Sequence, residues 1–203
     1  MAHPEWNDSY VANELPWDTG TPEPVLVAFV QAGSVAPGRT LEIGAGTGTN
    51  ARWLAEQGFD VLGVDLAPRA VEMARAKAGS SARFEVNDFL GAPPAGSFSF
   101  VFDRGCFHVF DEPDDRARFA ANVARALAPD GIWLSLIGST EGPPRDFGPP
   151  RRSARDVMAA VEPSLAIQEL ASTSFEGGRF HAAAWRCVAR RRSMPAQPST
   201  RRG

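Results

Sequence analysis

The sequence is poor in several residue types on which catalytic sites often depend. Among its 203 residues there are two cysteines, three histidines and a single lysine, Lys77. A lone lysine in a polar helical stretch argues against Schiff-base chemistry. The two cysteines, Cys106 and Cys187, do not make a disulfide framework, so we expect a protein of the reducing cytoplasm.

Net positive charge and long apolar runs are also missing. The formal net charge is −3 at pH 7. The chain as a whole therefore has no basic field for holding a phosphate backbone, and we expect no nucleic-acid partner. No apolar run approaches the ~20 residues of a membrane-spanning helix, so we expect no membrane contact. The apolar content of 43% is ordinary for a globular domain, which we expect to be a monomer or a homodimer.

Periodic patterns predict an alternation of strands and helices. We expect helices over residues 21–32, 50–57, 67–78, 113–127 and 153–161, and strands over residues 40–43, 59–64, 82–86, 97–102, 132–137, 164–173 and 179–190. This alternation predicts an α/β fold with a parallel sheet covered by helices on both faces. The connection between the last two strands is too short for a crossover, which predicts an antiparallel finish.

The composition divides the chain into an arm, one domain and a tail. Residues 1–20 are polar and aromatic and do not read as a core element. Residues 21–190 carry the alternating pattern and are expected to form a single domain. Residues 191–203 are basic and contain proline and serine, which predicts a disordered tail.

One stretch, residues 40–50, combines an apolar strand, three glycines and the start of a helix. Gly44, Gly46 and Gly48 follow the strand directly. Glycine adopts φ > 0 without strain, so a turn built from it lies flat against a ligand. The helix that follows points free N–H groups at the same place. The stretch therefore predicts a nucleotide-binding corner, although a glycine triplet alone also fits a tight turn that needs glycine for packing.

The spacing of the glycines and a neighbouring acid favour one class of nucleotide. The dinucleotide fingerprint is G-x-G-x-x-G, whereas this chain has G-x-G-x-G with Glu42 two residues before the first glycine. A carboxylate at that place fits poorly beside a pyrophosphate and suits a ligand with a cationic amino-acid end. The pattern Glu-x-Gly-x-Gly-x-Gly resembles motif I of the class I S-adenosylmethionine-dependent methyltransferases.

Acidic residues also end the second and third predicted strands, where ligands of open α/β sheets bind. Asp65 lies 21 positions after Gly44, at the place where an acid accepts from both ribose hydroxyls. The alternative is an acid favoured by a helix N-terminus. Asp88 is expected to accept from the adenine amine, with Leu66 or Phe89 against the ring, or else to belong to an ordinary polar turn.

Two further motifs make the resemblance more specific. The stretch Asp103-Arg104-Gly105-x-x-His108 follows the fourth predicted strand, and Pro16-Trp17-Asp18-x-Gly20 lies in the arm. Together they resemble the thiopurine, thiol, halide and tellurite methyltransferase group within class I, over roughly residues 17–190. The resemblance implies a Rossmann-like three-layer sandwich whose seven-stranded, mostly parallel sheet has an antiparallel last strand, and S-adenosyl-L-methionine as cofactor.

The same resemblance implies roles for the arm and for the end of the fourth strand. Trp17 would close over the cofactor with the arm; the alternative is that the tryptophans only anchor the arm on the domain. The backbone at Asp103 and Arg104 would bind the amino group of the methionine part. The loop 138–152, which includes the residues 145–147, is expected to border the acceptor site.

Methyl transfer from a sulfonium needs alignment and exclusion of water more than proton transfer. A thiolate acceptor needs little help with protons, whereas an alcohol or amine needs a positioned base. His108 is the candidate base, because histidine titrates near neutral pH; the alternative is a structural histidine. Asp103 is expected either to orient a ligand or to cap the local turn.

The sequence thus predicts an enzyme that methylates a small-molecule acceptor, in the first place a thiol or other soft nucleophile. An O- or N-methyltransferase of a small metabolite is the second hypothesis, and a non-catalytic S-adenosylmethionine-binding module is the third. A nicotinamide-dependent oxidoreductase disagrees with the glycine spacing and with Glu42.

Overall fold

The computed structural model describes residues 6–144, 148–176 and 182–192. The helices are α1 (Trp6–Ala12), α2 (Pro24–Gln31), α3 (Thr49–Glu56), α4 (Pro68–Ala78), α5 (Pro113–Ala126) and α6 (Ala154–Val161), with a 3₁₀ turn, η1 (Phe107–Val109). The strands are β1 (Arg39–Ile43), β2 (Asp60–Asp65), β3 (Arg83–Val86), β4 (Phe98–Arg104), β5 (Leu127–Gly138), β6 (Leu165–Phe175) and β7 (Ala182–Arg191).

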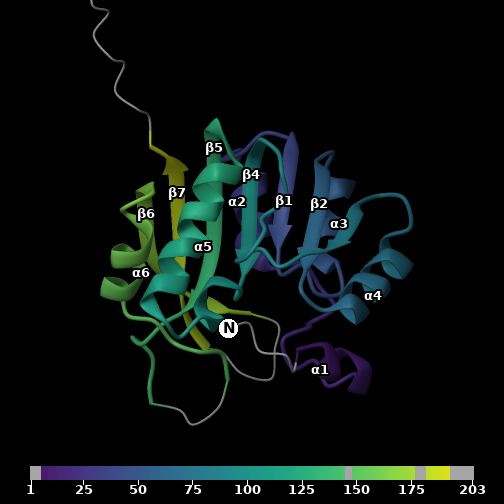
Figure 1. Ribbon diagram of the computed structural model, residues 1–203, viewed down its shortest axis with the longest axis horizontal. Coiled ribbons are helices and arrows are strands. Elements are labelled where there is room, and N and C mark those ends of the chain that lie inside the picture. Colours follow the sequence, from purple (N-terminus) through teal and green to yellow (C-terminus); the bar gives the residue numbers. More distant parts are fainter. Residues whose placement is uncertain (1–5, 145–147, 177–181, 193–203) are drawn as a thin grey trace, which may run out of the picture.

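The described strands form one seven-stranded sheet in the order β3-β2-β1-β4-β5-β7-β6. Neighbouring strands from β3 to β5 are parallel, whereas β7 runs antiparallel to both β5 and β6. In Figure 1 the arrow of β7 accordingly points opposite to that of β1. The predicted fold class, a mostly parallel Rossmann-like sheet with an antiparallel last strand, is confirmed.

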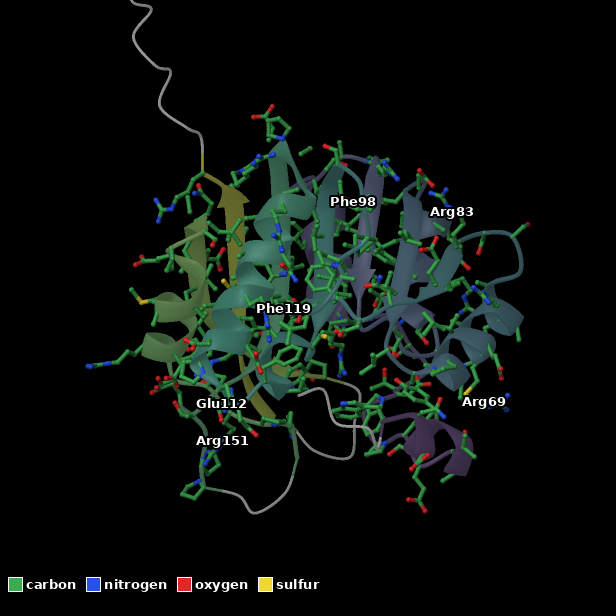
Figure 2. All side chains as sticks on the ribbon, viewed as in Figure 1. Arg69, Arg83, Phe98, Glu112, Phe119 and Arg151 are labelled. Atoms are coloured by element: carbon green, nitrogen blue, oxygen red, sulfur yellow. The ribbon has the colours of Figure 1, made fainter. Side chains whose placement is uncertain are left out.

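Helices cover both faces of the sheet, so the molecule has three layers. One core cluster lies under α5 and α6 and includes Phe119, Val123 and Val161. The other lies under α2, α3 and α4 and includes Leu26, Leu54 and Ala74. Phe119, labelled in Figure 2, belongs to α5 and is completely buried.

Side chains of β4 alternate between these two layers, because successive residues of a strand point to opposite faces. Val101 belongs to the core under α5, and Phe100 and Phe102 belong to the core under α2 and α3. Asp103 and Arg104, the last two residues of the strand, follow this alternation. They therefore point into different layers and cannot share one partner.

Three details differ from the sequence-based expectations. The arm contains helix α1, whose Tyr10 is buried against Ala67 and Ala70, although no core element was expected there. β5 begins at Leu127 rather than at residue 132, and its pairing with β4 shifts register at that point. β7 extends to Arg191, so the first residue of the expected tail belongs to the sheet; residues 193–203 lie outside the described residues.

Helix α1 lies beside the start of α4, below the sheet in Figure 1. The side chain of Asn7 accepts a hydrogen bond from the Arg69 backbone N–H at 3.0 Å, and this N–H belongs to the first turn of α4, where it has no intrahelical partner. The arm is thus attached to a helix end. Within the described part of the chain, no helix has the length and apolar character needed to cross a membrane.

Gly48 fixes the transition from the glycine turn into α3. Its φ is +80°, a left-handed conformation, and a Cβ added there would lie 2.8 Å from the Phe84 ring and 2.9 Å from the Ala74 Cβ. Two constraints therefore act together: backbone conformation and the close approach of β3 and α4 to the turn. At Gly48, the requirement for glycine is therefore explained by packing of the turn, without a ligand.

We expect Gly48→Ala to lower the free energy of unfolding by about 2–4 kcal/mol, because left-handed strain and overpacking add. Gly33→Ala is the matched control, since Gly33 has φ +70° but an added Cβ would meet nothing within 4 Å. The control should lose only about 1–2 kcal/mol. Urea unfolding of both variants measures the difference. Equal losses would mean that packing around Gly48 contributes nothing.

Candidate active site

The glycine turn lies at the edge of the sheet where the parallel strands end. Its backbone is bound to β2: the Ala45 N–H donates to the Val64 carbonyl at 2.9 Å, and the Gly46 N–H donates to the Asp65 carboxylate at 2.8 Å. The other Asp65 oxygen accepts from the Ala67 N–H at 2.9 Å. Burial raises the pKa of Asp65, and these N–H groups oppose the increase. Asp65 thus holds the turn and caps the entry to α4.

Glu42 lies beneath the turn and is almost completely buried, with 1% of its surface exposed. Its Oε1 accepts from the Asn50 side-chain amide at 3.1 Å. Its Oε2 is buried and has no hydrogen-bond partner among the described residues. Burial raises the pKa of Glu42 to about 8; the Asn50 amide and the Ala51 N–H oppose the increase most, the charge of Asp65 adds to it and that of Arg104 opposes it. A buried carboxylate oxygen without a donor is rare in proteins, so a ligand group is its natural partner.

The arm covers the turn from the solvent side. A Cβ added to Gly46 would lie 3.0 Å from the Tyr10 hydroxyl, which accepts from the Trp17 ring N–H at 3.3 Å. Asp18 accepts from the Thr47 hydroxyl at 2.7 Å. Burial, followed by the charge of Asp65, raises the pKa of Tyr10 above its usual range. The arm and the turn are therefore joined by polar contacts as well as by aromatic packing.

Arg104 joins β4 to both the arm and α2. It forms an ion pair with Glu23 at 2.5 Å and donates to the Trp17 carbonyl at 3.2 Å. Its guanidinium lies over the Phe175 ring, 5.0 Å from the ring centre. Glu23 is itself buried, so this pair is shielded from water. Arg104 is the point where the arm, α2, β4 and β6 meet.

Asp103 points to the layer on the other side of β4. Both Asp103 oxygens accept hydrogen bonds, one from the Trp133 ring N–H at 2.9 Å and the other from the Cys106 and Phe107 N–H groups at 3.1 and 3.0 Å. Burial raises its pKa to about 6, and these donors oppose the increase. This geometry favours the turn-capping alternative for Asp103.

His108 is buried, and its Nδ1 accepts from the Gly138 N–H at 2.7 Å. The neutral ring then carries its proton on Nε2 and cannot accept another there. Its ring also meets the Phe175 ring edge-on. The contacts favour the structural alternative, and the role of His108 as a base stays a prediction.

The residues predicted for the adenine end separate into two groups. Leu66 is 37% exposed directly after β2, and Asp88 is exposed after β3, where it accepts from the Leu90 N–H at 3.0 Å. Phe89, by contrast, is buried in the core and packs edge-on against Phe119. Of the two side chains expected against the ring, only Leu66 is accessible.

The structure therefore brings the glycine turn, Glu42, Asp65, Arg104 and Trp17 together and directs Asp103 into the opposite layer, whereas the His108 ring contacts the same Phe175 ring as Arg104. Sequence reasoning missed four residues that hold this site: Tyr10, Glu23, Thr47 and Asn50. Thr47 and Asn50 lie within residues 40–50, and their polar side chains beside the glycines were the signal that could have identified them. Of the loop expected to border the acceptor, residues 145–147 lie outside the described residues.

Comparison with known proteins agrees with this geometry. A sequence model of the family described as "Methyltransferase domain" matches residues 40–131, the part that carries the turn. A thiocyanate methyltransferase 1 from Brassica oleracea is 30% identical over 165 residues, which cover 77% of this chain and 72% of the relative.

The chain belongs to the class I S-adenosylmethionine-dependent methyltransferases.

A second methyltransferase relative, a probable thiol methyltransferase 2 from Arabidopsis thaliana, is 33% identical over 150 residues. The match covers 71% of this chain and 65% of the relative, so the chain spans about two thirds of the length of that protein. A solved structure described under the conversion of a disulfide bond into a thioacetal group during echinomycin biosynthesis has a TM-score of 0.80 at 29% identity, covering 92% and 91% of the two chains.

More distant methyltransferases share the fold alone. A TehB-like methyltransferase structure from Corynebacterium glutamicum has a TM-score of 0.70 at 21% identity and covers 94% of this chain and 100% of its own. S-adenosylmethionine is the cofactor of the family, and the site has the properties that it requires. The turn offers backbone without Cβ atoms, and the partnerless Glu42 oxygen matches a cationic amino-acid end.

Ionisation of Glu42 should make this methyltransferase less stable as the pH rises. The folded-state pKa of about 8 lies above the ordinary value of 4.5. Between these two values the folded protein holds a proton that the unfolded chain has lost, so the free energy of unfolding falls as the pH rises, until Glu42 ionises in the folded state as well. Between pH 6.5 and 9 we expect the ligand-free protein to lose about 2 kcal/mol of unfolding free energy.

Glu42→Gln, which cannot ionise, should remove most of this loss. Urea unfolding at several pH values measures it, and Glu56→Gln serves as an exposed control. Asp103 titrates lower, with a pKa of about 6, and contributes little in this range. A variant that keeps the full pH dependence would show that Glu42 is already ionised at pH 6.5.

Proposed function

We propose that this protein transfers the methyl group of S-adenosylmethionine to a small-molecule acceptor, in the first place a thiol. The observation that carries the proposal is the buried, partnerless Glu42 oxygen beneath a glycine turn that the arm covers. A cofactor with a cationic amino-acid end suits this place better than a pyrophosphate does. When bound, it supplies a methyl group on a sulfonium sulfur, which leaves as a neutral thioether.

The residues around the turn would bind and orient the cofactor. Gly44 and Gly46 would present their backbone to it, Glu42 in its ionised form would accept from its ammonium group, and Asp65 would accept from its ribose. Asp65 would have to share its carboxylate with the Gly46 and Ala67 N–H groups, which occupy one lone pair on each oxygen. The backbone at Asp103 and Arg104 is proposed to bind the amino-acid end.

The outer part of the site would hold the adenine and exclude water. Leu66 is proposed to lie against the ring and Asp88 to accept from its amine, since both are exposed at the strand ends. Phe89 and Gly48 would support these contacts from within, through packing. Trp17 is proposed to close over the cofactor with the arm, an action that Arg104 supports by donating to the Trp17 carbonyl.

The acceptor end favours a nucleophile that needs no enzymic base. Asp103 uses both oxygens inside the protein, and His108 uses Nδ1 to accept from Gly138. A thiol ionises near neutral pH without such help, whereas an alcohol does not. The names of two relatives, a probable thiol methyltransferase and a thiocyanate methyltransferase, support the same acceptor class.

A second acceptor class has one specific observation in its favour. A 2-heptyl-1-hydroxyquinolin-4(1H)-one methyltransferase from Mycobacteroides abscessus is 30% identical over 147 residues, which cover 69% of this chain and 63% of that relative. Its name describes a hydroxyquinolinone as the compound that is methylated. We keep an oxygen or nitrogen acceptor as the alternative, and retain as expectations a cytoplasmic monomer or homodimer that acts without nucleic acid.

A panel of thiols, halides, phenols and amines, assayed for release of S-adenosylhomocysteine, decides between these hypotheses. We expect thiols to react fastest. We also expect the pH midpoint of kcat/KM to follow the pKa of each thiol, because the thiolate is the nucleophile. The same midpoint for an aromatic and an alkyl thiol would instead reveal an enzymic base. Binding of S-adenosylhomocysteine without turnover of any acceptor would leave only the non-catalytic module.

His108→Asn separates the two roles of that residue. The Asn side-chain oxygen can take the place of Nδ1 and accept the Gly138 N–H, but it cannot act as a base near neutral pH. We expect kcat with a thiol to remain within about fivefold of the wild type, since general-base catalysis typically contributes 10²–10⁴-fold. A loss in that larger range, with normal thermal stability, would assign the base role to His108.

A further inference from the structure

The side chain of Asn50 connects two parts of the site that are distant in the sequence. Its Oδ1 accepts from the Glu23 backbone N–H at 2.8 Å, and its Nδ2 donates to Glu42 Oε1 at 3.1 Å. A backbone N–H requires an acceptor and a carboxylate requires a donor, so both contacts agree on one orientation of the amide. Asn50 therefore satisfies two groups that are buried or nearly so.

The contact of Asn50 with Glu42 determines which oxygen of the Glu42 carboxylate lacks a hydrogen-bond partner. Asn50 engages Oε1, and Oε2 remains buried without a partner among the described residues. A carboxylate that is held on one oxygen has less rotational freedom than one with two open oxygens. Its second oxygen is then presented in a fixed direction, which is what recognition of an ammonium group requires.

The contact of Asn50 with Glu23 connects the glycine stretch to the arm through further hydrogen bonds. Glu23 is the N-cap residue of α2, and its carboxylate forms an ion pair with Arg104. The Arg104 guanidinium also donates to the Trp17 carbonyl. A continuous path of hydrogen bonds thus runs from Glu42 through Asn50, Glu23 and Arg104 to the arm. Asn50 is the one side chain of this path that belongs to the glycine stretch itself.

The helix does not explain why an asparagine stands here. Asn50 is the second residue of α3, a position at which alanine would favour the helix. Removing the side chain therefore changes the two contacts with little effect on helix propensity. Because the contact with the Glu23 N–H also supports the fold, a comparison in a Glu42→Gln background is what separates a positioning role from a structural one.

We propose that Asn50 is a positioning residue for the cofactor: it orients Glu42 so that Oε2 meets the cationic amino-acid end, and it ties that carboxylate to the arm through Glu23. The inference rests on the proposed function, because it requires S-adenosylmethionine at the turn. It adds to that function a connection between occupancy of the turn and the position of the arm.

Substitutions separate the two contacts of Asn50. Asn50→Asp keeps an oxygen for the Glu23 N–H but cannot donate to Glu42, and it places a second carboxylate beside the first. Asn50→Ala removes both contacts. Gln168→Ala, at an exposed amide that bonds only to the nearby Ala166 carbonyl, is the control.

Calorimetry with S-adenosylhomocysteine measures the affinity of each variant. We expect Asn50→Asp and Asn50→Ala to bind about tenfold or more weakly than the wild type, as for loss of a hydrogen bond to a charged group, and Gln168→Ala to bind normally. In a Glu42→Gln background, Asn50→Asp should cause no further loss, because its target carboxylate is gone. A merely structural role would weaken binding in both backgrounds alike.

Hydrogen exchange tests the connection with the arm. The N–H groups of Asn13, Glu14 and Asp18 are bonded within the arm, and in the presence of saturating ligand they should exchange faster in Asn50→Ala than in Asn50→Asp. Affinity within twofold of the wild type for Asn50→Asp, or equal exchange in both variants, overturns the inference while the wild type still binds the ligand. If the wild type does not bind it, the proposed function fails as well.

Discussion

A carboxylate removed from water must be given hydrogen-bond donors, and Asp65 obtains them from the backbone of two different segments. Gly46, after β1, and Ala67, before α4, both donate to it. This single side chain therefore sets the distance between the glycine turn and the beginning of α4. The arm docks on that same helix end through Asn7 and Tyr10. The turn, the helix and the arm are consequently held together at one place, and the proposed cofactor site lies there.

Four acidic residues near the strand ends point to two different layers of the fold. Glu42, Asp65 and Glu23 are directed to the layer that contains α2 and α3, and Asp103 to the layer that contains α5. Each has a different set of donors: an amide and an open oxygen for Glu42, two backbone groups for Asp65, and a guanidinium for Glu23. The same carboxyl group thus serves as the proposed partner of a cation in Glu42, as an anchor of the turn in Asp65 and as half of an ion pair in Glu23.

Much of the fold could be predicted because it depends on local patterns. Alternating strands and helices and the glycine turn are visible in short windows of sequence, and the strand alternation of Phe100 and Phe102 would also have separated Asp103 from Arg104. The pair between Arg104 and Glu23 joins residues 81 positions apart, and no local pattern reveals it. Helix α1 was missed for a related reason: seven mixed residues become a helix through tertiary contact with α4.

The place of β7 in the sheet has a consequence for synthesis of the chain. β7 lies between β5 and β6, and β6 has no other neighbour in the described sheet. On the ribosome β6 emerges first and must wait with both edges open until β7 follows. The sheet can therefore be extended beyond β5 only after β7 has been synthesised, because β7 is the partner of both β5 and β6. Until then, the nascent chain exposes strand edges that a chaperone would recognise.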